Sequence, residues 1–396
     1  MRGRTEVSLF GNNARYRSLK PVRQNSAIIS ICNHFSARDM LRASGWVLEA
    51  NSVSSNLILP DAIERQIFEG YGGEVPSSED SRMWWDDHLK QMEKRALLSS
   101  SSTHPESAKP APHDVAYISV WTIDQEYPSL DFVLACTGRK PVFIFTNRSY
   151  GSISPSWLDR RIPLLAERMK ATIPERRVFS IVGVEPVVQR LATAWESLTG
   201  HTIIPEPYYQ ATHTFCTRQT LAPIQPPAFG PCRMGLASAA HLTQAGRLCS
   251  AFTDSAHDDP YRLSVEQGTQ EAKRLIDRKE LYVCEAPCGP GQTGWEVVCI
   301  VAVTRKSSKV AAVSKVFTHQ NHRRKGYAKL LLTHVCHEVL RTEQHIVLFV
   351  AHDLTTAAGV YGRVGFVGVG DRPISERSSV ERWLELGFKD TEIGHW

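Results

Sequence analysis

A basic turn that contains a glycine precedes a helix in the second half of the chain. An apolar strand pattern ends at Thr318, and helical spacing begins at about Tyr327. The first N–H groups of a helix have no partner within the helix, and the helix dipole places about half a positive charge at that end. Such a terminus binds pyrophosphate well. The turn therefore predicts a polyphosphate site made of Arg323, Arg324, Lys325, Gly326, Tyr327 and Ala328.

The residue types in this turn suit close contact with phosphate. Gly326 lets the backbone approach a ligand and adopt angles that a Cβ forbids, and Ala328 is also small. Arg324 and Lys325 add mobile positive charge. No Asp or Glu occurs across residues 305–329. An ordinary basic surface exposed to solvent would show the same charge. The assignment of a polyphosphate site therefore depends on a second motif at the expected distance along the chain.

That second element is a tyrosine motif further along the chain. The helix that begins at Tyr327 keeps an apolar stripe to about Arg341. The run HIVLFVAHD (345–353) has the pattern of a buried strand. The segment TTAAGVYGRVGF follows, which we expect to form a short helix that runs into another strand, and it contains Tyr361.

Residues 230–396 resemble the GNAT acetyltransferase superfamily in both motifs. Arg323 to Ala328 match its signature of Arg or Gln, two variable residues, Gly, one variable residue, then Gly or Ala. VYGRVGF matches its ending of Tyr, three residues and Gly-Phe. The order of strands and helices also matches. The resemblance implies an α/β fold with a mixed sheet whose two central strands splay apart. It also implies that acetyl-coenzyme A is the cosubstrate and that the reaction needs no metal.

The resemblance also implies roles for single residues. Val316, Phe317 and Thr318 would hold the pantetheine arm through their backbones, and Arg323 to Ala328 would surround the pyrophosphate. Tyr361 would lie near the thioester sulfur and protonate the leaving thiolate, or else only pack under the cofactor. Many members have an Asn before the tyrosine helix that contacts the cofactor. Here Thr356 stands near that place and is the expected substitute.

No general base can be identified from the sequence. The strand KVAAVSKVFT carries no carboxylate. The candidates are Glu285, Glu296, His319, His352 and Asp353.

The cysteines and histidines do not predict a metal site. The nine cysteines are irregularly spaced and mostly lie in apolar runs, which is typical of buried thiols in a reducing compartment. His334, Cys336 and His337 lie on one predicted helix. His334 and His337 could share a face of it, but no third ligand stands at a usable spacing. The net charge of +5 is too small to indicate nucleic-acid binding by itself. No apolar run is long enough to cross a membrane, so we expect a cytoplasmic protein.

The chain length indicates two domains. We expect a loose leader over 1–25, an N-terminal α/β lobe over 26–220, a Pro-rich linker over 221–231 and the GNAT domain over 232–396. A low-complexity loop at 99–113 interrupts the first lobe.

The first lobe shows the same alternation of strands and helices as the second. Strand patterns at 116–123, 131–137, 141–147 and 177–183 are joined or followed by helical patterns at 156–169 and 186–200. We interpret the lobe as a degenerate GNAT-like repeat without the basic glycine turn. An unrelated accessory lobe is the alternative. The whole chain also resembles two-lobed fungal GNAT proteins, which share its ending in WLELGF and GHW (383–388 and 394–396).

The sequence thus predicts an N-acetyltransferase that moves an acetyl group from acetyl-coenzyme A to a primary amine by direct attack. A different acyl donor and a non-catalytic coenzyme A-binding module are the alternatives. The sequence gives neither the acceptor, which is a small metabolite or a peptide, nor the oligomeric state.

Overall fold

The computed structural model describes residues 28–99, 115–123, 128–225, 230–254, 260–288, 293–370 and 380–395. The expected leader at 1–25, nearly all of the loop at 99–113 and part of the linker at 221–231 lie outside these ranges.

The first half of the chain alternates strands and helices, largely as the sequence indicates. Its strands are β1 (Ile28–His34), β2 (Val115–Ile123), β3 (Ser129–Thr137), β4 (Val142–Thr146), β5 (Ser180–Val184) and β6 (Tyr209–Thr217). Its α-helices are α1 (Ala37–Ala50), α2 (Leu59–Phe68), α3 (Ser78–Ser99), α4 (Pro155–Asp159), α5 (Ile162–Thr172) and α6 (Glu185–Thr199). The expected single helix at 156–169 is therefore two helices. The second begins with Pro163 in its first turn, where a missing N–H costs nothing.

The second half repeats the pattern. Its strands are β7 (Arg233–Leu236), β8 (Leu281–Pro287), β9 (Trp295–Thr304), β10 (Val310–Thr318), β11 (His345–Ala351) and β12 (Glu381–Gly387). Its α-helices are α7 (Leu242–Asp254), α8 (Val265–Asp277), α9 (Tyr327–Val339) and α10 (Thr355–Val364). The expectation that α10 runs into another strand is wrong for the described residues, because 365–370 form turns and β12 begins only at Glu381.

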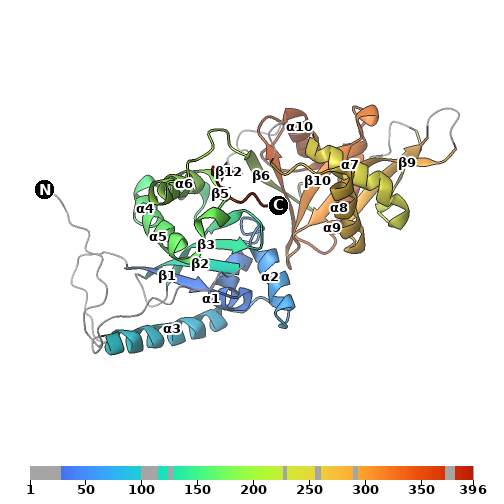
Figure 1. Ribbon diagram of the computed structural model, residues 1–396. Helices are drawn as coiled ribbons and strands as arrows, with labels where there is room; N and C mark the ends of the chain where they lie inside the picture. Colours follow the sequence, from blue (N-terminus) through green and yellow to red (C-terminus); the bar gives the residue numbers. More distant parts are fainter. Residues whose placement is uncertain are drawn as a thin grey trace.

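All these strands form one sheet in the order β1-β2-β3-β4-β5-β12-β6-β11-β10-β9-β8-β7. The two halves lie side by side along it, and β6 and β12 lie between them (Figure 1). Strand β6 comes from the first half but pairs with β11 from Ala211 to Thr217. Strand β12 comes from the second half but pairs with β5. Each half is thus completed by the last strand of the other.

The halves share one topology, as expected for a repeat. The series β1-β2-β3-β4 is antiparallel, β4 and β5 are parallel, and β12 closes the row in antiparallel sense. The series β7-β8-β9-β10 is likewise antiparallel, β10 and β11 are parallel, and β6 closes the row in antiparallel sense. The mixed α/β sheet with a repeated GNAT-like strand order confirms the predicted fold class.

Helices cover both faces of the sheet, which explains why the central strands are apolar throughout. In the second half, α9 and α10 pack on one face over residues such as Val301 and Val313. Helices α7 and α8 pack on the other face over residues such as Ile300 and Ala302. Alternate residues of one strand thus enter two cores, since successive side chains of a strand point to opposite faces.

An arginine–aspartate pair lies buried in the first half, near the start of α5. Arg161 Nε donates to Asp131 Oδ2 at 2.8 Å, and both side chains are only 6 % exposed. Thr122 Oγ1 donates to the same carboxylate and accepts from Arg161 Nη2. The network joins β2, β3 and α5, and every member has a partner.

Replacement of Asp131 by Asn is therefore expected to lower the free energy of unfolding by about 3–5 kcal/mol, because a buried guanidinium loses its counter-charge. Urea denaturation followed by circular dichroism measures this change. Asp159→Asn is the matched control, since its pair with Arg190 is about half exposed on both sides and contributes about 0–1 kcal/mol. Equal effects of the two substitutions would contradict the expectation.

Candidate functional site

A gap opens between the two parallel strands at the centre of the second half. Strands β10 and β11 pair only from Val310 to Ala312 and from His345 to Val347. Beyond Ala312, β10 pairs with β9 alone, and β11 pairs with β6 alone. Residues Val316, Phe317 and Thr318 therefore present one backbone edge to the gap, which is the place that the resemblance gives them.

An irregularity in β10 marks the point of divergence. Val313 pairs with Val303 and Lys315 pairs with Ala302, so Ser314 is an extra residue in the ladder. A bulge of this kind bends the strand and increases its twist. The bend turns the carboxyl end of β10 away from β11 and leaves room for an extended ligand between them.

The basic turn lies at the carboxyl end of β10 and leads into α9. A 3-10 turn at Gln320–His322 precedes it, and Gly326 is the N-cap residue of α9. Gly326 has φ +93°, and Arg324 has φ +66°. No side chain caps α9, and its first turn contains no acidic residue. This helix terminus therefore keeps its positive electrostatic character and is open to an anion.

The basic side chains of the turn are not equivalent. Arg323 folds back, because its Nε donates to the Thr318 carbonyl at 3.3 Å and its guanidinium lies 5.4 Å from the centre of the Phe317 ring. Arg324 and Lys325 are exposed. Tyr327 is buried, and Ala328 is half-buried. Arg324 and Lys325 thus remain the mobile charges that a polyphosphate would meet first.

Tyr361 lies on α10, which follows β11. The side chain is half-buried, packs against the core under α9, and meets Phe366 edge to face at 6.0 Å. Burial raises the pKa of Tyr361 well above its ordinary value, with a smaller contribution from Cys299. The phenol is therefore protonated at neutral pH and able to donate its proton.

The structure explains why the tyrosine motif contains a glycine at position 365. Gly365 ends α10 with φ +128°, and a Cβ there would collide with the backbone of Thr220 and Leu221. The backbone of the segment that follows β6 thus packs directly on the end of α10, and Ala222 N–H donates to the Val364 carbonyl at 2.8 Å. Only glycine satisfies both the dihedral angle and the contact.

The start of α10 and the start of α9 lie at the same edge of the sheet, because parallel strands β10 and β11 end there. Thr356 is the second residue of α10 and is exposed. No side chain caps this helix either. The fold thus places Thr356, Tyr361 and the basic turn around one end of the gap.

Residues 299–371 match the protein-family model described as FR47-like protein. The match begins in β9 and covers the gap, the basic turn and the tyrosine motif. The chain is thus similar to this family over the segment that carries both motifs. The description does not name a substrate, and the match leaves the first half of the chain uncovered.

Several solved structures match the chain at low sequence identity and with TM-scores below 0.5. An acetyltransferase of the GNAT family from Colwellia psychrerythraea is 13% identical, with a TM-score of 0.40 over 76% of this chain and 96% of that one. A tandem GNAT protein from the clavulanic acid biosynthesis pathway is 14% identical, with a TM-score of 0.40 over 76% and 94%. A GCN5-related N-acetyltransferase from Sphaerobacter thermophilus is 12% identical, with a TM-score of 0.43 over 90% and 94%. No curated protein matches the chain.

The five candidates for a general base in the second half of the chain differ in their surroundings. Glu285 lies 3.6 Å from His241, and Glu296 lies 3.0 Å from His322, so both are paired. His319 accepts a hydrogen bond from the Asn321 N–H and thereby closes the 3-10 turn.

His352 and Asp353 are exposed and directly follow β11. Of the five general-base candidates, all of which lie in the described part of the chain, only these two lie beside the gap without a side-chain hydrogen bond or ion pair of their own.

The sequence gives no sign of one residue that the fold brings to this site. Tyr209 starts β6, and its hydroxyl lies within electrostatic reach of Tyr361 and Asp353. Burial is the main cause that raises its pKa. No local pattern predicts this contact, since it depends on the pairing of β6 with β11 of the other half.

The corresponding helix start in the first half is closed. Ser154 caps α4, where its Oγ accepts from the Trp157 N–H at 3.3 Å, and Pro155 follows it. The guanidinium of Arg148 stacks over the Trp157 ring at 4.7 Å. The terminus thus lacks both the open cap and the glycine of α9, which agrees with a repeat that has lost the polyphosphate site.

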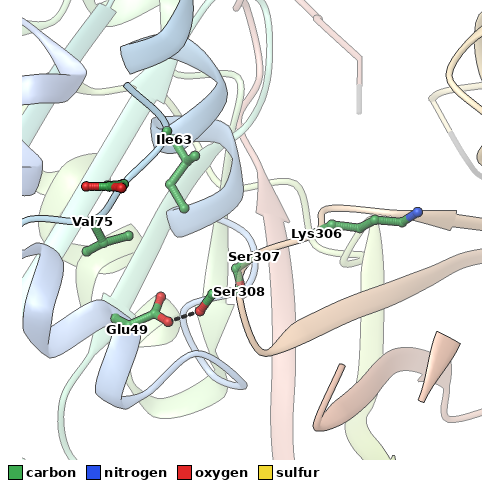
Figure 2. A pocket seen from close by; sticks show the side chains of 8 residues that line it. Glu49, Ile63, Val75, Lys306, Ser307 and Ser308 are labelled. Atoms are coloured by element: carbon green, nitrogen blue, oxygen red, sulfur yellow. Dashed lines mark hydrogen bonds between the residues drawn. The ribbon is translucent and has the colours of Figure 1, made fainter. Parts of the chain in front are cut away.

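A cavity of about 590 Å³ lies elsewhere, between α1, α2 and the turn that joins β9 to β10 (Figure 2). Ser308 donates a hydrogen bond to Glu49 across it, and Lys306 points away from Glu49. This turn is at the opposite end of β10 from the basic loop, so the cavity is separate from the gap.

The described residues contain no group of three or more His, Cys, Asp or Glu side chains placed to hold a metal ion. None of the helices in the described ranges combines the length and apolar character needed to cross a membrane.

Proposed function

We propose that the chain is an N-acetyltransferase that transfers an acetyl group from acetyl-coenzyme A to a primary amine. The observation that carries the proposal is the combination of an uncapped α9 terminus with a splayed β10–β11 pair at the same sheet edge. The uncapped helix terminus suits a pyrophosphate. The gap between the splayed strands suits an extended pantetheine arm. The match to a GNAT family model over these same residues supports it.

The proposed reaction is direct attack, without a covalent enzyme intermediate. The amine nitrogen attacks the thioester carbonyl, a C–N bond forms, and the C–S bond breaks. Backbone N–H groups at the edge of β10 polarise the carbonyl oxygen. Tyr361 gives its proton to the leaving thiolate, and the proton lost by the amine passes to water or to His352 or Asp353. The alignment of the two substrates in the gap supplies much of the acceleration.

The surroundings of the thiols support a cytoplasmic location as part of this proposal. All nine cysteines are unpaired, and seven of them are buried. Burial raises the pKa of Cys299 to about 12 and that of Cys249 to about 11, so these thiols stay protonated and unreactive. Such thiols need no oxidising compartment.

The test is release of free coenzyme A thiol from acetyl-coenzyme A in the presence of amines, amino acids, peptides and polyamines. Release that depends on one class of amine is the expected result. Release with a longer acyl-coenzyme A but not with the acetyl form would identify a different donor. If calorimetry shows that coenzyme A binds but no acyl donor is turned over, the proposed reaction is refuted. The protein would then be a coenzyme A-binding module.

A further inference from the structure

A histidine–glutamate pair lies beside the basic turn. His322 ends the 3-10 turn that precedes Arg323, and its Nε2 lies 3.0 Å from Oε1 of Glu296 on β9. The His322 ring also meets the ring of Tyr327 edge to face at 6.1 Å. Because Tyr327 is the first residue of α9, the imidazole lies against the helix terminus to which the pyrophosphate is assigned.

The imidazole of this pair is largely enclosed, and one of its nitrogens has no partner. The His322 side chain is only 15 % exposed, whereas that of Glu296 is 41 % exposed. Nδ1 of His322 is sealed from solvent, and no hydrogen-bonding group of the described residues meets it. Protonation of the ring would place an N–H at this position without an acceptor, which costs free energy. The geometry therefore favours the neutral imidazole in the unliganded protein.

The groups that face His322 come from all the elements around it. Burial is the main cause that lowers the pKa of His322 from its ordinary value. Glu296 of β9 opposes this effect, whereas Lys325 of the basic turn and His319 add to it. The His319 ring lies 5.8 Å from the His322 ring. Tyr327 of α9 stays uncharged, because burial raises the pKa of its phenol. Part of the effect that keeps His322 neutral thus comes from the basic turn itself.

A bound pyrophosphate would change this balance. Its negative charge would lie next to Lys325 and would offset the repulsion between Lys325 and the imidazolium. The pKa of His322 would then be higher in the complex than in the unliganded protein. A group that gains a proton on binding makes binding tighter as the pH falls. The gain in affinity begins near the pKa of the complex and is complete below that of the unliganded protein, which lies under the ordinary value of 6.5.

We propose that His322 and Glu296 belong to the pyrophosphate site, and that His322 takes up a proton from solvent when a pyrophosphate binds there. The inference rests on the proposed coenzyme A site and goes beyond it, because it makes the loading of the protein with its cosubstrate depend on pH. Glu296 has a positioning role, since its carboxylate holds the Nε2 edge of the ring and balances the charge of the imidazolium.

Calorimetry with dephospho-coenzyme A tests the proposal. This ligand keeps the pyrophosphate but lacks the phosphate monoester of coenzyme A, whose own pKa of about 6 would add a second pH dependence. We expect the dissociation constant to fall by about 5- to 10-fold from about pH 8 to about pH 5.5, since a shift of one pKa unit corresponds to a tenfold change in affinity. Titrations in two buffers with different ionisation enthalpies should show net uptake of protons.

Three variants assign the proton to His322. His322→Gln should bind with an affinity that hardly changes over this range and without proton uptake, because an amide does not titrate. Glu296→Gln should keep the pH dependence but move it to lower pH, because the imidazolium loses its carboxylate partner. His241→Gln is the matched control. His241 lies 3.6 Å from Glu285 directly before α7, which packs on the opposite face of the sheet from α9. Its pH profile should equal that of the unaltered protein.

The outcomes that contradict the proposal are distinct. A flat profile in the unaltered protein, or a slope that survives in His322→Gln, would overturn it. An equal loss of affinity at every pH in His322→Gln, with the slope unchanged, would show that the ring only supports the turn. Circular dichroism shows that each variant is folded.

Failure of the proposed function can be told apart from failure of this inference, because the readout is binding and needs no acceptor. Absence of turnover, with the pH-dependent binding intact, would refute the reaction and retain the proton uptake by His322. Binding without pH dependence would refute this inference alone. Absence of binding at every pH would overturn both.

Discussion

Substitution of Gly326 by Glu should abolish binding of coenzyme A. Gly326 is the N-cap residue of α9, and the backbone N–H groups that follow it are the expected partners of the pyrophosphate. A carboxylate at this position would occupy the space next to those groups and repel the phosphates. It would also neutralise the positive end of the helix. Several charge-assisted hydrogen bonds would be lost, so we expect the dissociation constant to rise by more than about 100-fold. Calorimetry with coenzyme A measures this directly.

The positive φ of Gly326 calls for a control, because any side chain at φ +93° costs about 1–2 kcal/mol. Gly200→Glu supplies it. Gly200 ends α6 in the first half with φ +78°, and nothing lies within 4 Å of the position that a Cβ would take. The control carries the same charge and a similar strain at a distant helix end. Intact affinity in Gly326→Glu, or an equal loss in Gly200→Glu, would refute the assignment of the phosphate site.

The elements of the domain could be predicted from the sequence because their signals are local. The apolar runs of β8, β9, β10 and β11 and the stripe of α9 each lie within one window of the chain. The two motifs are equally local, one at the start of α9 and the other at the end of α10. Gly326 follows three basic residues and directly precedes α9. The structure places the residues of these motifs around one gap, and their roles toward a cofactor stay a prediction.

The exchange of β6 and β12 could not be predicted in this way. A strand shows which of its faces is apolar but not which distant strand it pairs with, and β6 would satisfy the same pattern beside β5 or beside β11. The same limit applies to Tyr209. It has no unusual neighbour in sequence, and it interacts electrostatically with Tyr361 and Asp353 only because β6 of the first half pairs with β11 of the second.

Tyr361→Phe is expected to lower kcat by about 100-fold and to leave the affinity for coenzyme A nearly unchanged. A general acid acts in the transition state, when negative charge develops on the sulfur, and contributes about 10²- to 10⁴-fold. Burial holds the pKa of Tyr361 well above the ordinary value, so the phenol is available as a donor throughout the neutral range. The ring also packs against the core under α9, and Phe retains that packing. Steady-state kinetics combined with calorimetry separates the two effects.

Tyr282→Phe is the matched control for the loss of a half-buried phenol in the same domain. Tyr282 lies on β8, two strands from β10, and burial likewise raises its pKa. Its kcat should equal that of the unaltered protein. If Tyr361→Phe instead weakened coenzyme A binding and left kcat unchanged, the tyrosine would be a packing residue under the cofactor. The proton for the leaving thiolate would then have to come from another hydroxyl near the gap, of which Tyr209 is the one that already interacts with Tyr361.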